Sequence, residues 1–258
     1  MTPPPRVPWS LYDELIDAVP SGPRVRRAEA LGSWALIETE DGAVGVTSQY
    51  GGESRPREHD GDLVGMPLRD AAALLRSWNL VEAALGGAAL CAWTNTAERA
   101  ATAGIDDLTL QGAGTAFGCR LTDLAGKRVA VVGHFRGIEA LLDGGCELRV
   151  LERSPWEGDY PDTAAEYLLP ESDVVLMTAA TLANKTMPRL LELSAGARTV
   201  VLGPSTPLSP VLLAHGVSCL SGTVMEDPAG IIASLERGGR GKFRSGRHVN
   251  LVPALSRP

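Results

Sequence analysis

The chain has 258 residues, of which 44% are hydrophobic and 21% charged, so it can form one large domain or two modest ones with a sizeable core. Its formal net charge of −7 excludes a general nucleic-acid-binding protein, because such proteins need a basic surface. The best candidate for a membrane span, residues 80–93, is too short and contains Glu82, so no membrane partner is expected.

The four cysteines, Cys91, Cys119, Cys146 and Cys219, are scattered and form no C-x-x-C pair. This scatter predicts neither a thiolate zinc site nor a framework of disulfides. No apolar segment of the kind found in secretory signals follows the first residues. A reducing cytoplasm is therefore the simplest location.

Residues 1–116 predict a small α+β domain. Ser10 can cap a short helix, and Asp41-Gly42 is a hairpin signal between two strand-like runs. A polar, glycine-rich stretch over 50–65 predicts a loop before two helices rich in Ala and Leu. The predicted elements are a helix over 11–19, strands over 25–30, 34–39 and 43–49, and helices over 68–77 and 80–94.

Residues 117–258 predict a Rossmann-like α/β domain with a doubly wound parallel sheet. The runs 129–132 and 174–177 are apolar without alternation, which is typical of strands buried on both faces. Strands and helices interleave along this half, and residues 98–117 are expected to connect the two domains. The predicted strands cover 128–133, 147–152, 173–178, 198–203 and 217–220, and the helices cover 137–142, 185–194, 210–215 and 228–237.

Ligands of open parallel sheets bind outside the carboxyl ends of the strands, so the loops at those ends predict a cofactor site. Glu152 lies nineteen positions after Gly133, where an acidic group can accept from ribose hydroxyls, although a solvated strand end would look the same. The loops after the third and fourth strands gather hydroxyls and backbone N–H groups at helix N-termini, which favour anions. The predicted cofactor-binding residues are Gly133, Phe135, Glu152, Arg153, Thr178, Asn184, Gly203, Ser205 and Thr206.

A transition-metal site is predicted at the tip of the first of these strands. His134 lies there, and the loop 154–167 is rich in carboxylates. A neutral imidazole beside carboxylates suits a divalent transition metal such as iron, so His134, Asp159 and Glu166 are the predicted ligands. The alternatives are a hydrogen-bonding structural histidine and solvated carboxylates.

Two further residues are predicted to be catalytic. Glu82 lies in an otherwise apolar helix and is followed by Gly86 and Gly87, which would let a ligand or another backbone approach closely. We therefore predict that Glu82 faces the Rossmann crevice together with Asn79, although Glu82 on a solvated stripe is the alternative. Lys185, in the loop after the third strand, is the second predicted catalytic residue.

Several of these segments resemble one known family. Gly-His-Phe, Leu-Glu-Arg, Glu-Gly-Asp-Tyr-Pro-Asp, Leu-Ala-Asn-Lys-Thr-Met-Pro-Arg and Leu-Gly-Pro-Ser-Thr-Pro occur in order over 127–238 and resemble the heavy-metal-chelation family, formerly domain of unknown function 364. Residues 77–86 resemble its companion N-terminal domain, which is similar to the N-terminal domain of enolases. The resemblance implies metal binding in a cleft between two domains. Arg136, where the family commonly has proline, and Ala179-Ala180, where glycine and threonine are expected, depart from the pattern.

These features predict a metal-dependent enzyme that acts on a small molecule. S-adenosylmethionine or another chelating amino-acid-like substrate would suit both a ribose-binding carboxylate and a metal, and would permit alkyl transfer or cyclisation. The alternative is a non-catalytic heavy-metal-chelation protein. A nicotinamide oxidoreductase is disfavoured because Ile138 or Glu139 stands where the third glycine of the fingerprint belongs. A homodimer is compatible with the sequence.

Overall fold

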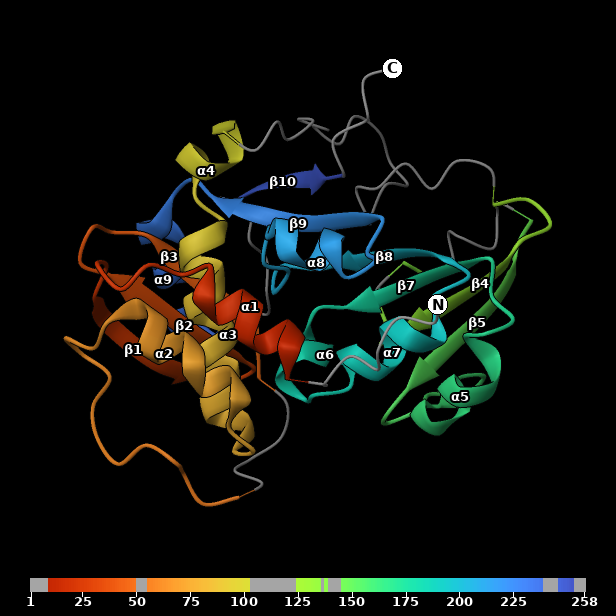
Figure 1. Ribbon diagram of the computed structural model, residues 1–258, viewed down its shortest axis with the longest axis horizontal. Coiled ribbons are helices and arrows are strands. Elements are labelled where there is room, and N and C mark those ends of the chain that lie inside the picture. The colour runs from red at the N-terminus through yellow and green to blue at the C-terminus, as the bar shows by residue number, and fades with distance from the viewer. Residues whose placement is uncertain are drawn as a thin grey trace, which may run out of the picture.

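The computed structural model describes residues 9–49, 55–102, 124–135, 137–138, 145–238 and 246–252. The predicted domain boundary at 116/117, most of the predicted helix over 137–142 and most of the predicted connection over 98–117 lie outside these residues. Figure 1 shows a small sheet and its helices on one side and a large sheet on the other, with helices α1 and α3 between them.

The N-terminal half contains the predicted three-stranded meander. Strands β1 (Val25–Leu31), β2 (Trp34–Thr39) and β3 (Val44–Ser48) pair antiparallel in sequence order. The helix predicted over 68–77 is divided into α2 (Leu68–Ala73) and a 3-10 turn, η1 (Leu74–Arg76). The other helices are α1 (Ser10–Asp17), α3 (Leu80–Thr94) and α4 (Ala97–Thr102).

The C-terminal half is a Rossmann-like α/β unit, as predicted. Its strands lie in the order β10-β9-β8-β7-β4-β5-β6, and all neighbours are parallel except β9 and β10. The six parallel strands follow the classic dinucleotide-fold order, in which the first strand along the chain, β4, lies beside the fourth, β7. The strands are β4 (Arg128–Val132), β5 (Glu147–Glu152), β6 (Tyr160–Pro161), β7 (Val174–Thr178), β8 (Arg198–Leu202), β9 (Cys219–Met225) and β10 (Gly246–Leu251).

Two of these strands were not predicted. β6 is only two residues long and lies inside the acidic loop, so no pattern along the chain marks it. β10 adds an antiparallel edge strand to β9. The segments between the strands carry η3 (Asp162–Ala164), α5 (Ala165–Leu168), α6 (Ala180–Ala183), α7 (Met187–Leu193), α8 (Pro210–Ala214) and α9 (Pro228–Glu236).

One hydrophobic core runs through both halves. A single cluster joins Ile37 of β2 and Ala88 of α3 to Val175 and Met177 of β7. A second cluster packs β2 and β3 against α9, for example Leu36 against the C-terminal half of the chain. The predicted units are therefore fused by packing, and the small sheet shares helix α9 with the large one.

Asn95, at the end of α3, joins the halves by hydrogen bonds. The fully buried Asn95 amide donates to the carbonyl oxygens of Thr206 (2.9 Å) and Thr223 (3.2 Å). Its side-chain oxygen accepts from the Leu208 N–H (3.0 Å), and its carbonyl accepts from the Met225 N–H (3.1 Å). One side chain thus satisfies backbone groups of the loop after β8 and of strand β9.

The cysteine expectation is wrong for one residue. Cys219 of β9 is disulfide-bonded, whereas Cys91 and Cys146 are thiols. The sequence could not predict this bond because disulfide formation depends on the spatial separation of the sulfur atoms and not on their spacing along the chain. Among the described residues, no helix is long and apolar enough to cross a membrane.

Helix α3 packs so closely that Gly86 has no space for a side chain. A Cβ atom there would lie 2.1 Å from the Leu75 backbone nitrogen of η1. Gly86→Ala should therefore lower the free energy of unfolding by about 3 kcal/mol or more, the upper end for overpacking, because backbone cannot yield as a flexible side chain can. The control is Gly196→Ala, since a Cβ atom at Gly196 meets nothing within 4 Å. Equal denaturation midpoints for the two variants would contradict this account of the packing.

Candidate functional site

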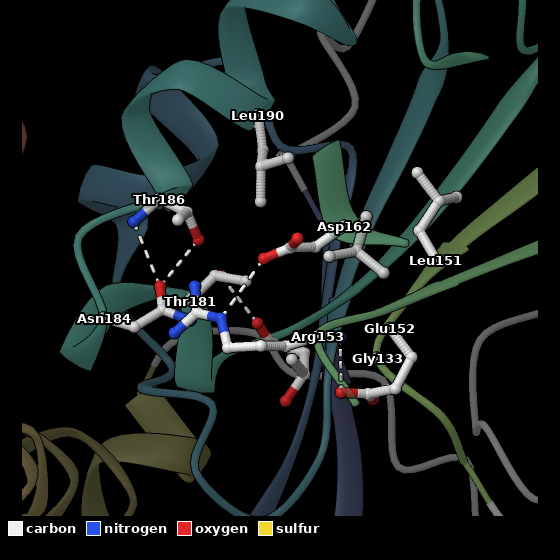
Figure 2. Close-up of a pocket in the computed structure, with 11 residues that line it drawn as sticks. Gly133, Leu151, Glu152, Arg153, Asp162, Thr181, Asn184, Thr186 and Leu190 are labelled. Atoms are coloured by element: carbon white, nitrogen blue, oxygen red, sulfur yellow. Dashed lines mark hydrogen bonds and ion pairs between the residues drawn. The ribbon is translucent and has the colours of Figure 1, made fainter. Parts of the chain in front are cut away.

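A pocket lies at the carboxyl edge of the large sheet, where β4, β5 and β7 end (Figure 2). It contains about 550 Å³ of space, part of it open to solvent. Because β4 and β7 are neighbours, the pocket lies at the topological switch point of the sheet, where open α/β proteins bind their ligands. Its lining residues are Val132, Gly133, Leu151, Glu152, Arg153, Asp162, Thr178, Thr181, Asn184, Thr186 and Leu190.

Glu152, predicted to bind a cofactor, ends β5 and lines this pocket. Its carboxylate accepts from the backbone N–H groups of His134 (2.8 Å), Arg153 (2.7 Å) and Ser154 (3.3 Å). The first of these bonds joins the ends of β4 and β5. Glu152 is therefore not a freely solvated strand end, because three backbone N–H groups already bind its carboxylate.

Charged and polar side chains face the pocket from the other strand ends. Arg153 donates to the Asp162 carboxylate at 3.2 Å, and Figure 2 shows this ion pair beside Glu152. Asn184 accepts from the backbone N–H (3.1 Å) and the hydroxyl (2.6 Å) of Thr186, which fixes the turn before α7. Of the predicted cofactor-binding residues, the structure thus gathers Gly133, Glu152, Arg153, Thr178 and Asn184.

The turn after β4 is tight. Gly133 has a φ of +98°, and a Cβ atom there would meet the Thr178 methyl group at 3.0 Å. Glycine is required at this position because a side chain would strain the backbone and crowd the neighbouring strand. Phe135 does not line the pocket and instead packs against the apolar layer that contains Val129 and Ile138.

His134 and Asp159, two of the predicted metal ligands, lie in contact. Nδ1 of His134 is 3.1 Å from Oδ2 of Asp159, and the two side chains are 13% and 5% exposed. Asp159 also accepts from the Trp156 N–H at 3.0 Å, and the Trp156 ring lies 4.0 Å from the imidazole, centroid to centroid. An ionised carboxylate only accepts, so Nδ1 carries a hydrogen, and in a neutral imidazole Nε2 then has the free electron pair.

Glu166, the third predicted ligand, is not joined to this pair. It forms a bidentate ion pair with Arg189 of α7, at 2.9 and 2.6 Å. The described part of the chain contains no group of three or more His, Cys, Asp or Glu side chains that could hold a metal. The predicted triad is therefore corrected to a histidine–aspartate pair, because Glu166 turns toward the cation of the neighbouring helix.

Gly203, Ser205 and Thr206, predicted from the loop after β8, do not line the pocket. Ser205 is buried between the two halves, where its hydroxyl accepts from the Ser48 N–H at 2.8 Å. Thr206 is fully buried, and its carbonyl accepts from Asn95. The loop has the composition of an anion site, but Ser205 and Thr206 lie at the seam between the halves.

Glu82 and Asn79 hold the start of α3 and the preceding loop together. Glu82 is 3% exposed, and its carboxylate accepts from the Glu58 N–H (2.9 Å), the His59 N–H (2.9 Å) and the Ser77 hydroxyl (2.6 Å). Asn79 caps α3 by accepting from the N–H groups of residues 81 and 82. Neither residue lines the switch-point pocket, so the expectation that both face the Rossmann crevice is not met.

Burial alone would raise the pKa of Glu82, but the hydrogen bonds from Glu58, Ser77 and His59 lower it overall. These bonds stabilise the ionised form of the carboxylate. The side chain therefore has the surroundings of a structural anion and not those of a general base, whose pKa would lie near neutrality.

Lys185, predicted to be catalytic, connects the pocket loop to the N-terminal half. It stands between the pocket residues Asn184 and Thr186 and has a φ of +67°, a left-handed conformation that is costly for a residue with a side chain. Its ammonium donates to the carbonyls of Ala183 (2.8 Å) and Ser77, and Nζ lies 5.8 Å from the Trp78 ring centroid. Burial lowers the pKa of Lys185 to about 8, against the opposing effect of the Glu58 carboxylate.

Several pocket residues carry no sequence pattern that predicts a site role: Asp162, Thr181, Thr186 and the apolar residues Val132, Leu151 and Leu190. Asp162 follows β6 directly, so recognising that short strand would have placed this carboxylate at the carboxyl edge. The two threonines and Leu190 come from α6, α7 and the turn between them. Only the way these helices fold back over the sheet brings them to the pocket.

The fold and this pocket define a Rossmann-like α/β protein with a small-molecule site at the switch point, joined to a small α+β unit. The chain belongs to the family described as "Putative heavy-metal chelation": the DUF364 model matches residues 115–250, and DUF4213, described in the same words, matches residues 12–94. The family resemblance and the fold class predicted from the sequence are confirmed.

Two crystal structures of DUF364 proteins with unknown function are similar to the whole chain. One, from Desulfitobacterium hafniense DCB-2, is 36% identical with a TM-score of 0.81, over 95% of this chain and 98% of that one. The other, PH1506 from Pyrococcus horikoshii, is 20% identical with a TM-score of 0.74, over 94% of this chain and 98% of that one. At this low identity the similarity supports the fold alone. No curated protein matches the chain.

We expect Glu82→Gln to lower the free energy of unfolding by about 1–3 kcal/mol at pH 7, because a buried set of donors loses its anionic acceptor. A carboxyl group whose pKa is lowered by folding stabilises the protein above its unfolded pKa and loses this contribution as the pH falls through the folded value. The difference in the free energy of unfolding between the wild type and Glu82→Gln should therefore become smaller as the pH falls. Chemical denaturation at pH 7 and below pH 4 measures it, with the exposed Glu40→Gln as control. A gap that stays constant with pH would contradict the assignment.

Lys185→Met should change how stability depends on alkaline pH. Between about pH 8 and 10.5 the folded chain has lost the Lys185 proton while the unfolded chain still holds it. The unfolded state then binds more protons, so the stability of the wild type rises with pH relative to the variant. Thermal denaturation from pH 7.5 to 10 measures this difference, and Lys127→Met, at an exposed lysine, is the control. Parallel curves for wild type and Lys185→Met would show that the ammonium is not desolvated.

Proposed function

We propose that the protein is a metal-dependent enzyme that binds S-adenosylmethionine, or another chelating amino-acid-like small molecule, in the switch-point pocket. The observation that carries this proposal is the Glu152 carboxylate at the edge of a pocket in a sheet of the dinucleotide-fold order. The substrate class is a small molecule with a nucleoside part and a chelating part, and the proposed reaction is alkyl transfer or cyclisation.

The pocket suits the nucleoside part. Val132, Leu151 and Leu190 offer apolar surface for a purine ring, and Glu152 lies beside them. A carboxylate has about four acceptor positions, and three backbone N–H groups use three of those on Glu152. One position therefore remains for a ribose hydroxyl, while the three bonds keep the carboxylate oriented.

The His134–Asp159 pair suits the chelating part. A metal-binding histidine usually donates its second ring N–H to a carboxylate, which fixes the ring and leaves the other nitrogen for the metal. His134 has this arrangement, with Nδ1 directed at Asp159 and Nε2 available. Asp159 is thereby an orienting residue more than a ligand.

The donor types fit a transition metal, but their number is small. With no group of three or more ligating side chains among the described residues, the other coordination positions fall to the bound small molecule and to water, and an aminocarboxylate can fill two of them. A metal bound there would supply Lewis acidity and a template for the substrate. The chain itself would hold the nucleoside at Glu152 and the imidazole in one orientation.

The alternative function is non-catalytic heavy-metal chelation, and the family description favours it. A chelation protein needs tight metal binding by the chain alone. The proposed enzyme instead needs the small molecule to complete the coordination shell. The two functions therefore differ in whether metal affinity depends on that molecule.

Calorimetric titration of the full chain with a divalent transition metal, with and without S-adenosylmethionine, tests the proposal. We expect the metal to bind at least about tenfold more tightly when S-adenosylmethionine is present. Asp159→Asn should weaken metal binding about 10- to 100-fold, the usual loss for an orienting partner, and His134→Gln at least as much.

The control is Glu166→Gln, which removes the carboxylate that pairs with Arg189 and should leave metal affinity unchanged. Tight metal binding without S-adenosylmethionine, unaffected by it, would favour the chelation alternative. Full affinity in His134→Gln would place the metal elsewhere and overturn the proposed site.

A further inference from the structure

We propose that the switch-point pocket selects nucleosides without a 5′-phosphate and rejects nucleotides and dinucleotides, and that Glu152 makes this selection. This inference rests on the proposed function and narrows its substrate class. The substrate would be a neutral or cationic 5′-substituted adenosine, as opposed to a pyrophosphate such as NAD or ADP.

A hydrogen bond joins the end of β5 to the turn after β4. In dinucleotide-binding proteins the backbone N–H groups of this turn and the helix that follows receive the pyrophosphate. Here the His134 N–H is donated to Glu152 at 2.8 Å. A carboxylate of the protein already occupies one donor position that a phosphate oxygen would need, and its negative charge would repel the phosphate.

The turn after β4 also differs in sequence from the turn of dinucleotide-binding proteins. The dinucleotide fingerprint needs a glycine two positions after Gly133, so that the backbone can approach the pyrophosphate closely. Phe135 stands at that position, and its ring is anchored in the apolar layer below. Ile138, which belongs to the same layer, replaces the third glycine. The turn therefore lacks both the glycine that lets the backbone approach a pyrophosphate and the glycine that lets the helix pack closely on the strand.

The charge of the described pocket lining also disfavours a phosphate. Its charged side chains are Glu152, Asp162 and Arg153, and Asp162 pairs with Arg153 at 3.2 Å. Among the described lining residues the single cation is therefore already neutralised, and Glu152 leaves a net negative charge. Such a lining favours a sulfonium or ammonium group on the ligand and disfavours a phosphate.

Calorimetric titration of the full chain with adenosine, S-adenosylmethionine, AMP and ADP tests the selection. EDTA is present throughout, so that no metal can attract the phosphates. We expect the wild type to bind adenosine and S-adenosylmethionine, and to bind ADP at least about tenfold more weakly than adenosine. Glu152→Gln keeps an acceptor oxygen and removes the charge, so the preference for adenosine over ADP should fall by about tenfold.

Two further variants separate the effect of the Glu152 charge from the effect of changing the net charge of the protein. Glu152→Asp keeps the charge and should keep the rejection of ADP. Glu157→Gln makes the same charge change at an exposed residue of the neighbouring loop that does not line the pocket, and should leave the preference unchanged.

The outcomes distinguish this inference from the proposed function. If adenosine does not bind in EDTA and S-adenosylmethionine does not bind with the divalent metal either, the proposed function fails and this inference fails with it. If ADP binds the wild type as tightly as adenosine, the nucleoside site stands and the selection is wrong. A preference that is unchanged in Glu152→Gln, or lost equally in Glu157→Gln, removes Glu152 from the selecting role.

Discussion

The structure depends on the close packing of helix α3 between its two halves and on the hydrogen bonds of Asn95 at its end. α3 is buried on most of its surface, with small residues such as Gly86 where η1 crosses it. Asn95 then satisfies backbone groups of strand β9 and of the loop that follows β8 in the large sheet. Because a buried backbone group without a partner is costly, these bonds fix the distance and orientation of the halves.

This seam explains why several polar residues that resemble site residues are structural. Ser205 and Thr206 belong to a loop with the composition of an anion site, yet they face α3 and β3. Glu82 is an isolated carboxylate in an apolar helix, and it binds the N–H groups of a neighbouring loop. A buried acid is tolerated when donors surround it, so its isolation in the sequence signals a partner but does not say which one.

The candidate site shows the same competition between structural and functional roles on a smaller scale. Glu152 joins two strand ends and also lines the pocket. His134 is held by Asp159 through one nitrogen, which leaves the other nitrogen for a ligand. In both residues the structural hydrogen bonds set the orientation that binding would need, so stability and the proposed function are not in conflict at these positions.

The sequence alone determined the fold class of this protein, its strands of four residues or more within residues 128–202, and the edge of the sheet where a ligand would bind. These follow from local patterns: apolar runs such as 174–177 predict buried strands, and the ends of parallel strands lie at one edge. For β9 the sequence predicted 217–220, whereas the strand covers Cys219–Met225. It also indicated Glu152 and His134 as candidate site residues, because Glu152 ends one predicted strand and His134 directly follows another.

Only the tertiary structure decided which polar side chains reach the pocket. Asp162 enters through a two-residue strand, Glu166 leaves toward Arg189, and Ser205 turns to the seam. Those outcomes depend on which partner each side chain meets across the fold. The spacing of residues along the chain does not tell which residues come close together in space.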